Sequence, residues 1–196
     1  MKKQITRADI LSLAEFEQVR QQRRQDILRA KRNRRLSLGP DTTIFFENYD
    51  TMWWQVHEML RIEKGGEEQI ADELAAFNPL IPQGNELVIT MMIEIGDPQR
   101  RAQVLGGLGG IEDTLIIRFA DHEIHGQAEE DIDRTTADGK ASSVQFVHFV
   151  FTAEQIVDFC KEGLDVIFEC THPNYSHKAI LSGAMHKELI NDFCES

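Results

Sequence analysis

From residue 86 onward, the predominant pattern of this chain changes to a period of two, and this change constrains the fold more than any other feature. A period of two is the pattern of β-strands, whose successive side chains point to opposite faces. The segment ELVITMMIEI at 86–95 is apolar on both faces, which indicates a central strand. Further strand patterns lie at residues 114–119, 123–131, 142–151, 165–171 and 175–181. An Asp-Gly pair at 138–139 predicts a hairpin turn.

A long helix is predicted near the start of the chain. Ser12 and Glu15 have the spacing of a capping box, in which each side chain satisfies a free backbone N–H of the first turn. The helix is expected to run to about Arg35, because Gly39 and Pro40 are unsuited to continuing it. Its apolar stripe is thin, so most of it should be exposed.

A short strand at 42–46 leads into the clearest helical pattern of the sequence, at about 47–63. Five apolar residues there fall at steps of three and four and share one face: Tyr49, Met52, Trp53, Val56 and Leu60. Further helices are predicted at 67–77, at 98–105 behind Asp97 as N-cap, at 152–163 and at 183–193.

Strands joined by hairpins, with helices first and last, predict an α+β fold. We expect a mainly antiparallel sheet of about six strands with flanking helices and a basic N-terminal helical arm. The regular alternation of strand and helix that marks a doubly wound nucleotide-binding fold is missing. The predicted organisation is a basic helical arm at 1–40 and a single acidic α+β domain at 41–196.

The net charge of −12 conceals a strong asymmetry between these two parts. Residues 1–40 hold 11 Lys and Arg against 4 Asp and Glu, whereas residues 41–196 hold 10 against 29. A basic arm is therefore joined to a very acidic body. Asymmetry of this kind suggests that the arm has a binding role.

The sequence predicts a cytoplasmic protein without a cofactor. The first residues include no apolar run of signal-peptide length, and no segment approaches the roughly 20 apolar residues of a membrane helix. Cys160, Cys170 and Cys194 are far apart and form no C-x-x-C pair, so no zinc or iron–sulfur motif is present. Reduced thiols are the expected state.

One acidic and histidine-rich stretch, FADHEIHGQAEED at 119–131, is a candidate metal site. On a strand, Asp121, Glu123 and His125 would share a face and could hold Mn²⁺, Fe²⁺ or Zn²⁺. The alternative is that they form the solvated face of a hairpin strand that continues into the acidic residues 129–133. We favour the solvated hairpin, because nothing nearby in the sequence supplies a fourth ligand.

Two further histidines lie in distinctive sequence contexts, a turn and an apolar strand. His172 and Tyr175 flank Pro173 and Asn174, which mark a turn between strands; the pair could serve in acid–base chemistry, but the sequence identifies no nucleophile beside them. His148 lies among Val and Phe residues and is interpreted as a hydrogen-bonded core residue, whose pKa burial would lower.

The basic segment at 20–35 has eight Lys and Arg and one acidic residue. Four of its arginines are predicted to contact a partner: Arg23, Arg24, Arg32 and Arg35. We expect this segment to lie along an acidic surface, either of its own body or of a second subunit. Nucleic-acid binding is the weaker alternative, because stacking aromatic residues are missing from the segment and the acidic body would repel a polyanion.

The polar side of the helix at 47–63 is a second candidate interface. Its members, at helical spacing, are Thr51, Trp54, Gln55, Glu58 and Arg61. A tryptophan flanked by arginine is typical of protein interfaces. The alternative is that another element of the chain covers Trp54.

Several segments together carry a resemblance. They are RRLSLGP at 34–40, FEN followed by EMLR within 46–63, MIEIGDPQRR at 92–101, ASSVQFVHFVF at 141–151 and HPNY at 172–175. On these motifs the chain resembles a bacterial family of uncharacterised proteins, often encoded beside rubrerythrin-like proteins and iron–sulfur proteins similar to heterodisulfide reductase subunits. The family-like residues are Glu47, Thr51, Gln55, Glu58, Arg61, His172, Pro173 and Tyr175. The resemblance implies a link to redox or peroxide defence, but no activity.

The sequence therefore predicts an accessory protein, more plausibly not an enzyme, that docks onto a protein partner such as a rubrerythrin-like or iron–sulfur redox protein, or assembles as a homodimer. No membrane partner is expected. The alternative function is a metal-dependent enzyme using Asp121, Glu123 and His125. A weaker one is nucleic-acid binding through the arm.

Overall fold

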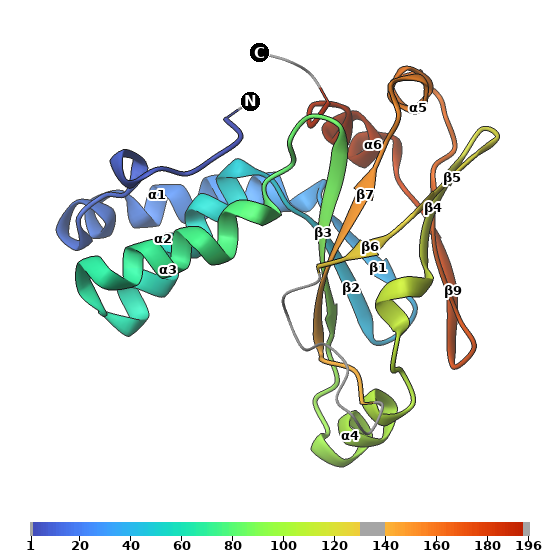
Figure 1. Cartoon of the computed structure of the whole chain (residues 1–196), viewed down its shortest axis with the longest axis horizontal. Helices are drawn as coiled ribbons and strands as arrows, with labels where there is room; N and C mark the ends of the chain where they lie inside the picture. Colours follow the sequence, from blue (N-terminus) through green and yellow to red (C-terminus); the bar gives the residue numbers. More distant parts are fainter. Residues whose placement is uncertain (1, 130–139, 194–196) are drawn as a thin grey trace.

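The computed structural model describes residues 2–129 and 140–193 and confirms the α+β fold (Figure 1). The strands described there form two antiparallel sheets rather than one. The five-stranded sheet has the order β1-β2-β3-β7-β6, with bounds Arg35–Leu38, Thr42–Phe46, Glu86–Ile93, Val144–Val150 and Gln127–Ala128. The four-stranded sheet has the order β5-β4-β8-β9, with bounds His122–His125, Leu115–Phe119, Ile167–His172 and Tyr175–Ile180.

The main hydrophobic core lies between the two sheets and includes residues from both, such as Ile89 of β3 and Phe168 of β8. Gly126 lies at the point where the chain passes from β5 in one sheet to β6 in the other, and its N–H donates to the Leu115 carbonyl at 2.9 Å. A Cβ atom at Gly126 would lie 2.6 Å from Cγ1 of Val147. Glycine is therefore required there by close packing.

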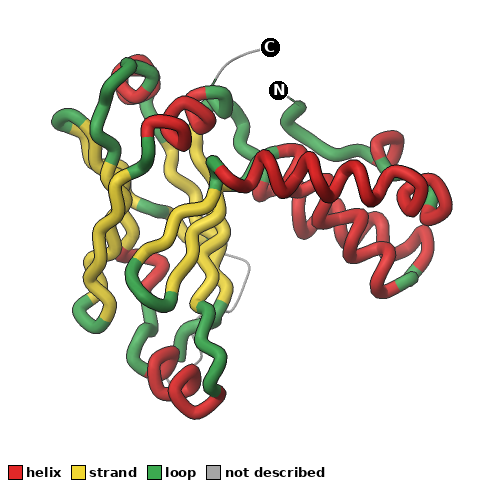
Figure 2. The backbone as a smooth tube through the Cα atoms, turned by 180° about the vertical axis from the view of Figure 1, so that it is seen from behind, coloured by secondary structure: helices red, strands yellow, loops and turns green. Residues whose placement is uncertain are grey.

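Three helices form a separate unit that projects to one side of the sheets (Figures 1 and 2). They are α1 (Leu13–Arg32), α2 (Tyr49–Glu63) and α3 (Gly66–Phe77), with α2 packed against both of the others. A second hydrophobic cluster joins this unit to the sheet, because Met52 and Val56 of α2 pack with Val88 of β3. β3 is thus covered on both faces, as its apolar sequence predicts.

The N-terminal segment before α1 is bound along the helical unit. Ile5 and Ile10 are buried in the second cluster. The Ile5 N–H donates to Asn78 Oδ1 at 2.7 Å, and Asn78 Nδ2 donates back to the Ile5 carbonyl at 3.0 Å. This pair of bonds satisfies an extended backbone in the way a neighbouring strand would.

The end of the first helix differs from the prediction. The capping box of Ser12 and Glu15 is present, but α1 ends at Arg32 and the next residues turn into β1. Arg35 is therefore a strand residue, not a helical one. Residues 35–38 alternate exposed and buried, and they pair with β2.

The remaining helices are short, and two of them begin with the N-caps that the sequence predicts. Asp97 accepts a hydrogen bond from the Arg100 N–H at the start of α4 (Pro98–Gly106), and Thr152 forms a capping box at the start of α5 (Ala153–Phe159). α6 spans Gly183–Ile190, and single 3₁₀ turns lie at Arg7–Asp9, Asn78–Leu80 and Ile111–Thr114. None of the helices in the described part of the chain is long and apolar enough to cross a membrane. The Asp-Gly turn predicted at 138–139 lies outside the described residues.

Candidate functional site

The outer face of α1 carries exposed basic and apolar side chains. Arg24, Leu28 and Arg32 follow one another at steps of four residues and share this face. All three are exposed, and Leu28 is 57% exposed. Neither Arg24 nor Arg32 pairs with an acidic residue within 2–129 or 140–193. We name Arg24, Leu28 and Arg32 the α1 stripe.

The other two arginines predicted to contact a partner already contact aromatic rings of the same chain. The guanidinium carbon of Arg23 lies 5.2 Å from the centre of the Trp53 ring. Arg35 lies 5.6 Å from the centre of the Phe45 ring, and its Nη2 is 3.9 Å from Oε2 of Glu94. Both arginines therefore already make contacts within this chain.

The face of α1 beside the α1 stripe, where Arg20 lies one helical turn before Arg24, pairs with α2. Arg20 donates from Nε to Glu58 Oε1 at 2.6 Å and from Nη2 to Oε2 at 3.1 Å, and Arg61 donates to the same Oε2 at 3.3 Å. The hydrogen bond from Arg20 lowers the pKa of Glu58, so this carboxylate is ionised. The arm therefore lies, along this face, against an acidic group of its own chain.

Trp54 is partly covered by the arm. Its ring lies 5.7 Å from the ring of Phe16 of α1, centre to centre, and Phe16 is almost fully buried. Trp54 and the neighbouring Gln55, Glu58 and Arg61 remain partly exposed along the seam between α1 and α2.

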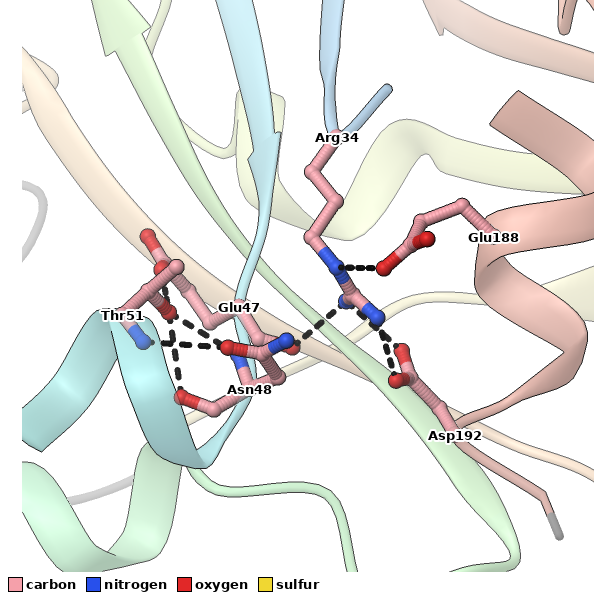
Figure 3. A network of polar contacts seen from close by, with 6 residues as sticks. All are labelled: Arg34, Glu47, Asn48, Thr51, Glu188 and Asp192. Atoms are coloured by element: carbon pink, nitrogen blue, oxygen red, sulfur yellow. Dashed lines mark hydrogen bonds and ion pairs between the residues drawn. The ribbon is translucent and has the colours of Figure 1, made fainter. Parts of the chain in front are cut away.

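Thr51 is placed differently from the rest of the polar side. It is only 2% exposed, and its Oγ1 donates to Glu47 Oε2 at 2.6 Å (Figure 3). The same oxygen accepts from the Asn48 N–H, while the Thr51 N–H donates to Asn48 Oδ1. Thr51 thus serves as the capping partner that begins α2, and it is not available to a partner at the surface.

Arg34 forms a buried ion pair at the junction between the helical unit and the sheets. It is 1% exposed and donates to both carboxylate oxygens of Asp192, at 3.0 and 2.6 Å, and to Glu188 at 3.1 Å (Figure 3). A further bond runs to the Glu47 carbonyl at 3.4 Å. Burial opposes the charge, but the Asp192 and Glu188 carboxylates outweigh it and raise the pKa of Arg34. The network fixes the C-terminal helix beside the start of α2.

The acidic and histidine-rich strand has exposed polar side chains around the buried Ile124. Glu123 and His125 lie on β5, and their side chains are 51% and 65% exposed. Glu123 pairs with Arg118 of the neighbouring strand. Asp121 precedes the strand, in an exposed turn. Throughout 2–129 and 140–193, no three His, Cys, Asp or Glu side chains are grouped so that they could hold a metal ion. The continuation at 130–133 lies outside the described residues.

His172 and Tyr175 face each other across the turn between β8 and β9, which confirms the predicted turn. Both are buried and bound to backbone groups. His172 Nδ1 accepts from the Asn174 N–H at 3.2 Å, and the Tyr175 hydroxyl donates to the Leu38 carbonyl at 2.7 Å. The Tyr175 oxygen also accepts from the Asp41 N–H at 3.1 Å. The contacts bind the β8–β9 turn to the β1–β2 turn.

His148 is bound by two carboxylates, which the sequence did not reveal. Its Nδ1 lies 2.9 Å from Glu86 Oε2, and its Nε2 lies 3.0 Å from Glu129 Oε1. Burial would lower its pKa, but the bonds to Glu86 and Glu129 and their charges outweigh burial and raise it. The effect of burial on the pKa is therefore outweighed, and His148 is the hydrogen-bonded residue that the sequence predicts. Glu86 lies on β3 and His148 lies on β7, so the sequence of neither strand alone indicates that they pair.

Cys170 lies in the core between the sheets and is 0% exposed. Burial raises the pKa of the Cys170 thiol, which keeps it protonated and unreactive. Cys194 lies outside the described residues.

Comparison with known proteins adds a family but no activity. The family model described as "Protein of unknown function (DUF3501)" matches residues 4–193. A crystal structure of a novel protein of unknown function from Burkholderia pseudomallei is similar, with 32% sequence identity, a TM-score of 0.89, and coverage of 97% of this chain and 99% of that one. No curated protein matches the chain. The chain therefore belongs to the DUF3501 family of proteins of unknown function.

Proposed function

We propose that this chain is a cytoplasmic accessory protein that docks onto a protein partner through the α1 stripe. The observation that supports this proposal most strongly is the exposure of Leu28 between Arg24 and Arg32 on a helix that projects away from the sheets. An exposed leucine flanked by arginines that pair with no acidic group in the described part of the chain is suited to an acidic protein surface with an apolar centre. The partly exposed Trp54, Gln55, Glu58 and Arg61 form the flank of the proposed surface.

The partner we propose is a redox protein of the rubrerythrin-like or iron–sulfur type. The support for this choice is the resemblance described above, and the acidic body argues against a nucleic acid as the partner. A second copy of the chain is the alternative occupant of the stripe, because its acidic body would present the complementary charge. In either case the arginines steer the encounter and Leu28 supplies the apolar contact.

The proposal is tested by measuring binding of the purified chain to rubrerythrin-like and iron–sulfur proteins from the same organism. We expect the variant Arg24→Glu with Arg32→Glu to weaken association at least about tenfold, mainly through the association rate, and added salt to weaken the wild type. The control is Lys161→Glu with Lys187→Glu, which makes the same change of net charge on the exposed surface of the sheet body.

Equal loss of binding in both double variants would show that net charge, and not the α1 stripe, governs association. Sedimentation of the chain alone tests the second-copy alternative, since a dimer that dissociates in the Arg24→Glu and Arg32→Glu variant would identify the occupant as another copy. Absence of binding to either redox protein, with a monomeric chain, would contradict the proposal.

A further inference from the structure

The free end of the helical unit contains a pocket of about 330 Å³. It lies between the N-terminal segment, the first turn of α1, the second half of α2 and the start of α3. Its volume is at the lower end of the range that small-molecule sites occupy. The residues of the α1 stripe do not line it, so it is separate from the proposed docking surface.

The interior of the pocket is apolar. The chief apolar lining residues are Ile10, Leu13, Phe16, Leu60 and Ile70, which come from all four segments. A ligand that fills such an interior gains stability in proportion to the apolar surface it removes from water.

His57 lines the same interior but offers no free polar atom. Its Nδ1 lies 2.8 Å from the Trp53 carbonyl oxygen and must donate to it, while its Nε2 accepts from the Leu11 N–H at 3.1 Å. Burial lowers the pKa of His57, which favours this neutral form. The imidazole therefore contributes only its ring surface to the lining of the pocket. The buried part of a ligand can form no hydrogen bond with it.

The rim of the pocket has a single positive charge in excess. Arg7 and Glu67 pair there, with Arg7 Nη2 2.9 Å from Glu67 Oε2, and so neutralise each other. Lys64, the third charged lining residue, is exposed and its ammonium pairs with no group in the described ranges. An apolar interior under one unpaired cation is suited to a molecule with an apolar tail and one anionic end.

We propose that this pocket binds a medium-chain carboxylate, with the alkyl chain among Phe16, Leu60 and Ile70 and the carboxylate at Lys64. Tryptophan emission reports such binding directly. The chain has two tryptophans, and the ring of Trp53 lies 3.9 Å from that of His57 and 6.0 Å from that of Phe16, both of which line the pocket.

The experiment is a titration of the full chain with hexanoate, heptanoate and octanoate, followed by tryptophan emission and by calorimetry. We expect saturable binding of one molecule, with affinity rising about fourfold for each added methylene. Lys64→Glu should weaken octanoate about fivefold or more and leave the uncharged octanol unchanged. Leu60→Phe should abolish binding of both by filling the pocket, whereas the control Lys187→Glu should alter neither.

Two results would overturn the proposal. One is the lack of saturable octanoate binding to the folded wild type. The other is octanoate binding that is equally strong in Lys64→Glu and Leu60→Phe, because it would then occur elsewhere on the surface. If Leu60→Phe does not fold, Lys64→Glu still tests octanoate binding, because Lys64 is exposed and its replacement should leave the fold intact.

Discussion

Arg34 and Asp192 are 158 positions apart in the sequence, and their side chains meet at 2.6 Å where the helical unit joins the sheets. Both side chains are almost wholly buried, Arg34 at 1% exposed and Asp192 at 0%. By contrast, the pair formed by Arg29 and Asp26 has the same 2.6 Å separation on the exposed surface of α1. The two pairs share residue types and shortest distance, but Arg34 is buried and also donates to Glu188 and to the Glu47 carbonyl, whereas Arg29 is exposed and donates to Asp26 alone among the described acidic groups.

Removal of one partner of the buried pair should destabilise the fold strongly. Arg34→Met leaves the Asp192 carboxylate buried without its partner, and we expect the free energy of unfolding to fall by about 3–5 kcal/mol. The matched change Arg29→Met should cost less than about 1 kcal/mol, because an exposed pair gains little. Urea unfolding of the three proteins checks both values.

A compensating variant separates loss of the ion pair from loss of packing. Arg34→Met combined with Asp192→Leu removes both charges, and apolar replacement of a buried pair is often close to neutral. We therefore expect the double variant to be more stable than Arg34→Met alone. A double variant that is less stable than either single variant would contradict this account of the junction.

The stabilisation that His148 gives the fold should decrease as the pH rises. Because Glu86 and Glu129 raise its pKa above the unfolded value of about 6.5, the stabilisation is fully present below that pH and is lost as the pH rises through the folded pKa. We expect the stability difference between the wild type and His148→Gln to shrink over the pH interval that begins at about 6.5 and extends upward. Unfolding measured across this interval provides the test, and Glu129→Gln should flatten the same profile. A difference that grows with pH would refute the double carboxylate contact.

His57 should have the opposite effect. Burial lowers its pKa, so the unfolded chain binds the proton more readily, and the fold loses stability as the pH falls below about 6.5. Protonation of Nε2 would also remove the acceptor of the Leu11 N–H. We expect His57→Gln to lose this acid-side dependence in unfolding measured between about pH 7 and pH 5. An unchanged slope in the variant would show that other groups cause it.

Substitution of Gly126 tests the close packing at the passage between the sheets, and substitution of Gly106 is its control. Gly126→Ala places a Cβ 2.6 Å from Val147 Cγ1, and overpacking of this kind costs about 1–3 kcal/mol. Gly106→Ala, in α4, meets nothing within 4 Å and should be neutral or stabilising by up to about 1 kcal/mol. Thermal unfolding of both variants provides the comparison. Equal effects would mean that the turn from β5 to β6 relaxes to admit a side chain.

Local features of the fold were predictable from the sequence. Capping at Ser12, Asp97 and Thr152 begins helices where expected, and the doubly apolar β3 is covered on both faces. These features depend on neighbouring residues or on one strand's pattern, which a sequence displays directly. The four-residue alternation of β1 was also present in the sequence, but the basic composition up to Arg35 favoured a longer helix.

Long-range polar contacts were not predictable. The buried state of Arg34 depends on Asp192, and the state of His148 depends on Glu86, 62 positions away. Nothing in the sequence near either residue indicates its partner. For the same reason Thr51 was expected on an open polar face, although its bonds to Glu47 and Asn48 bury it. The passage of the chain from one sheet to the other at Gly126 likewise depends on close packing against Val147, which lies 21 positions away.

The most direct test of the proposed function is photo-crosslinking in living cells, with a benzoylphenylalanine in place of Leu28. The control carries the same group in place of Val157, which is 65% exposed on α5 compared with 57% for Leu28. We predict a discrete adduct from position 28 and none from position 157, with its mass distinguishing a redox protein from a second copy. An adduct from position 157 alone, or from neither position, would contradict docking through the α1 stripe.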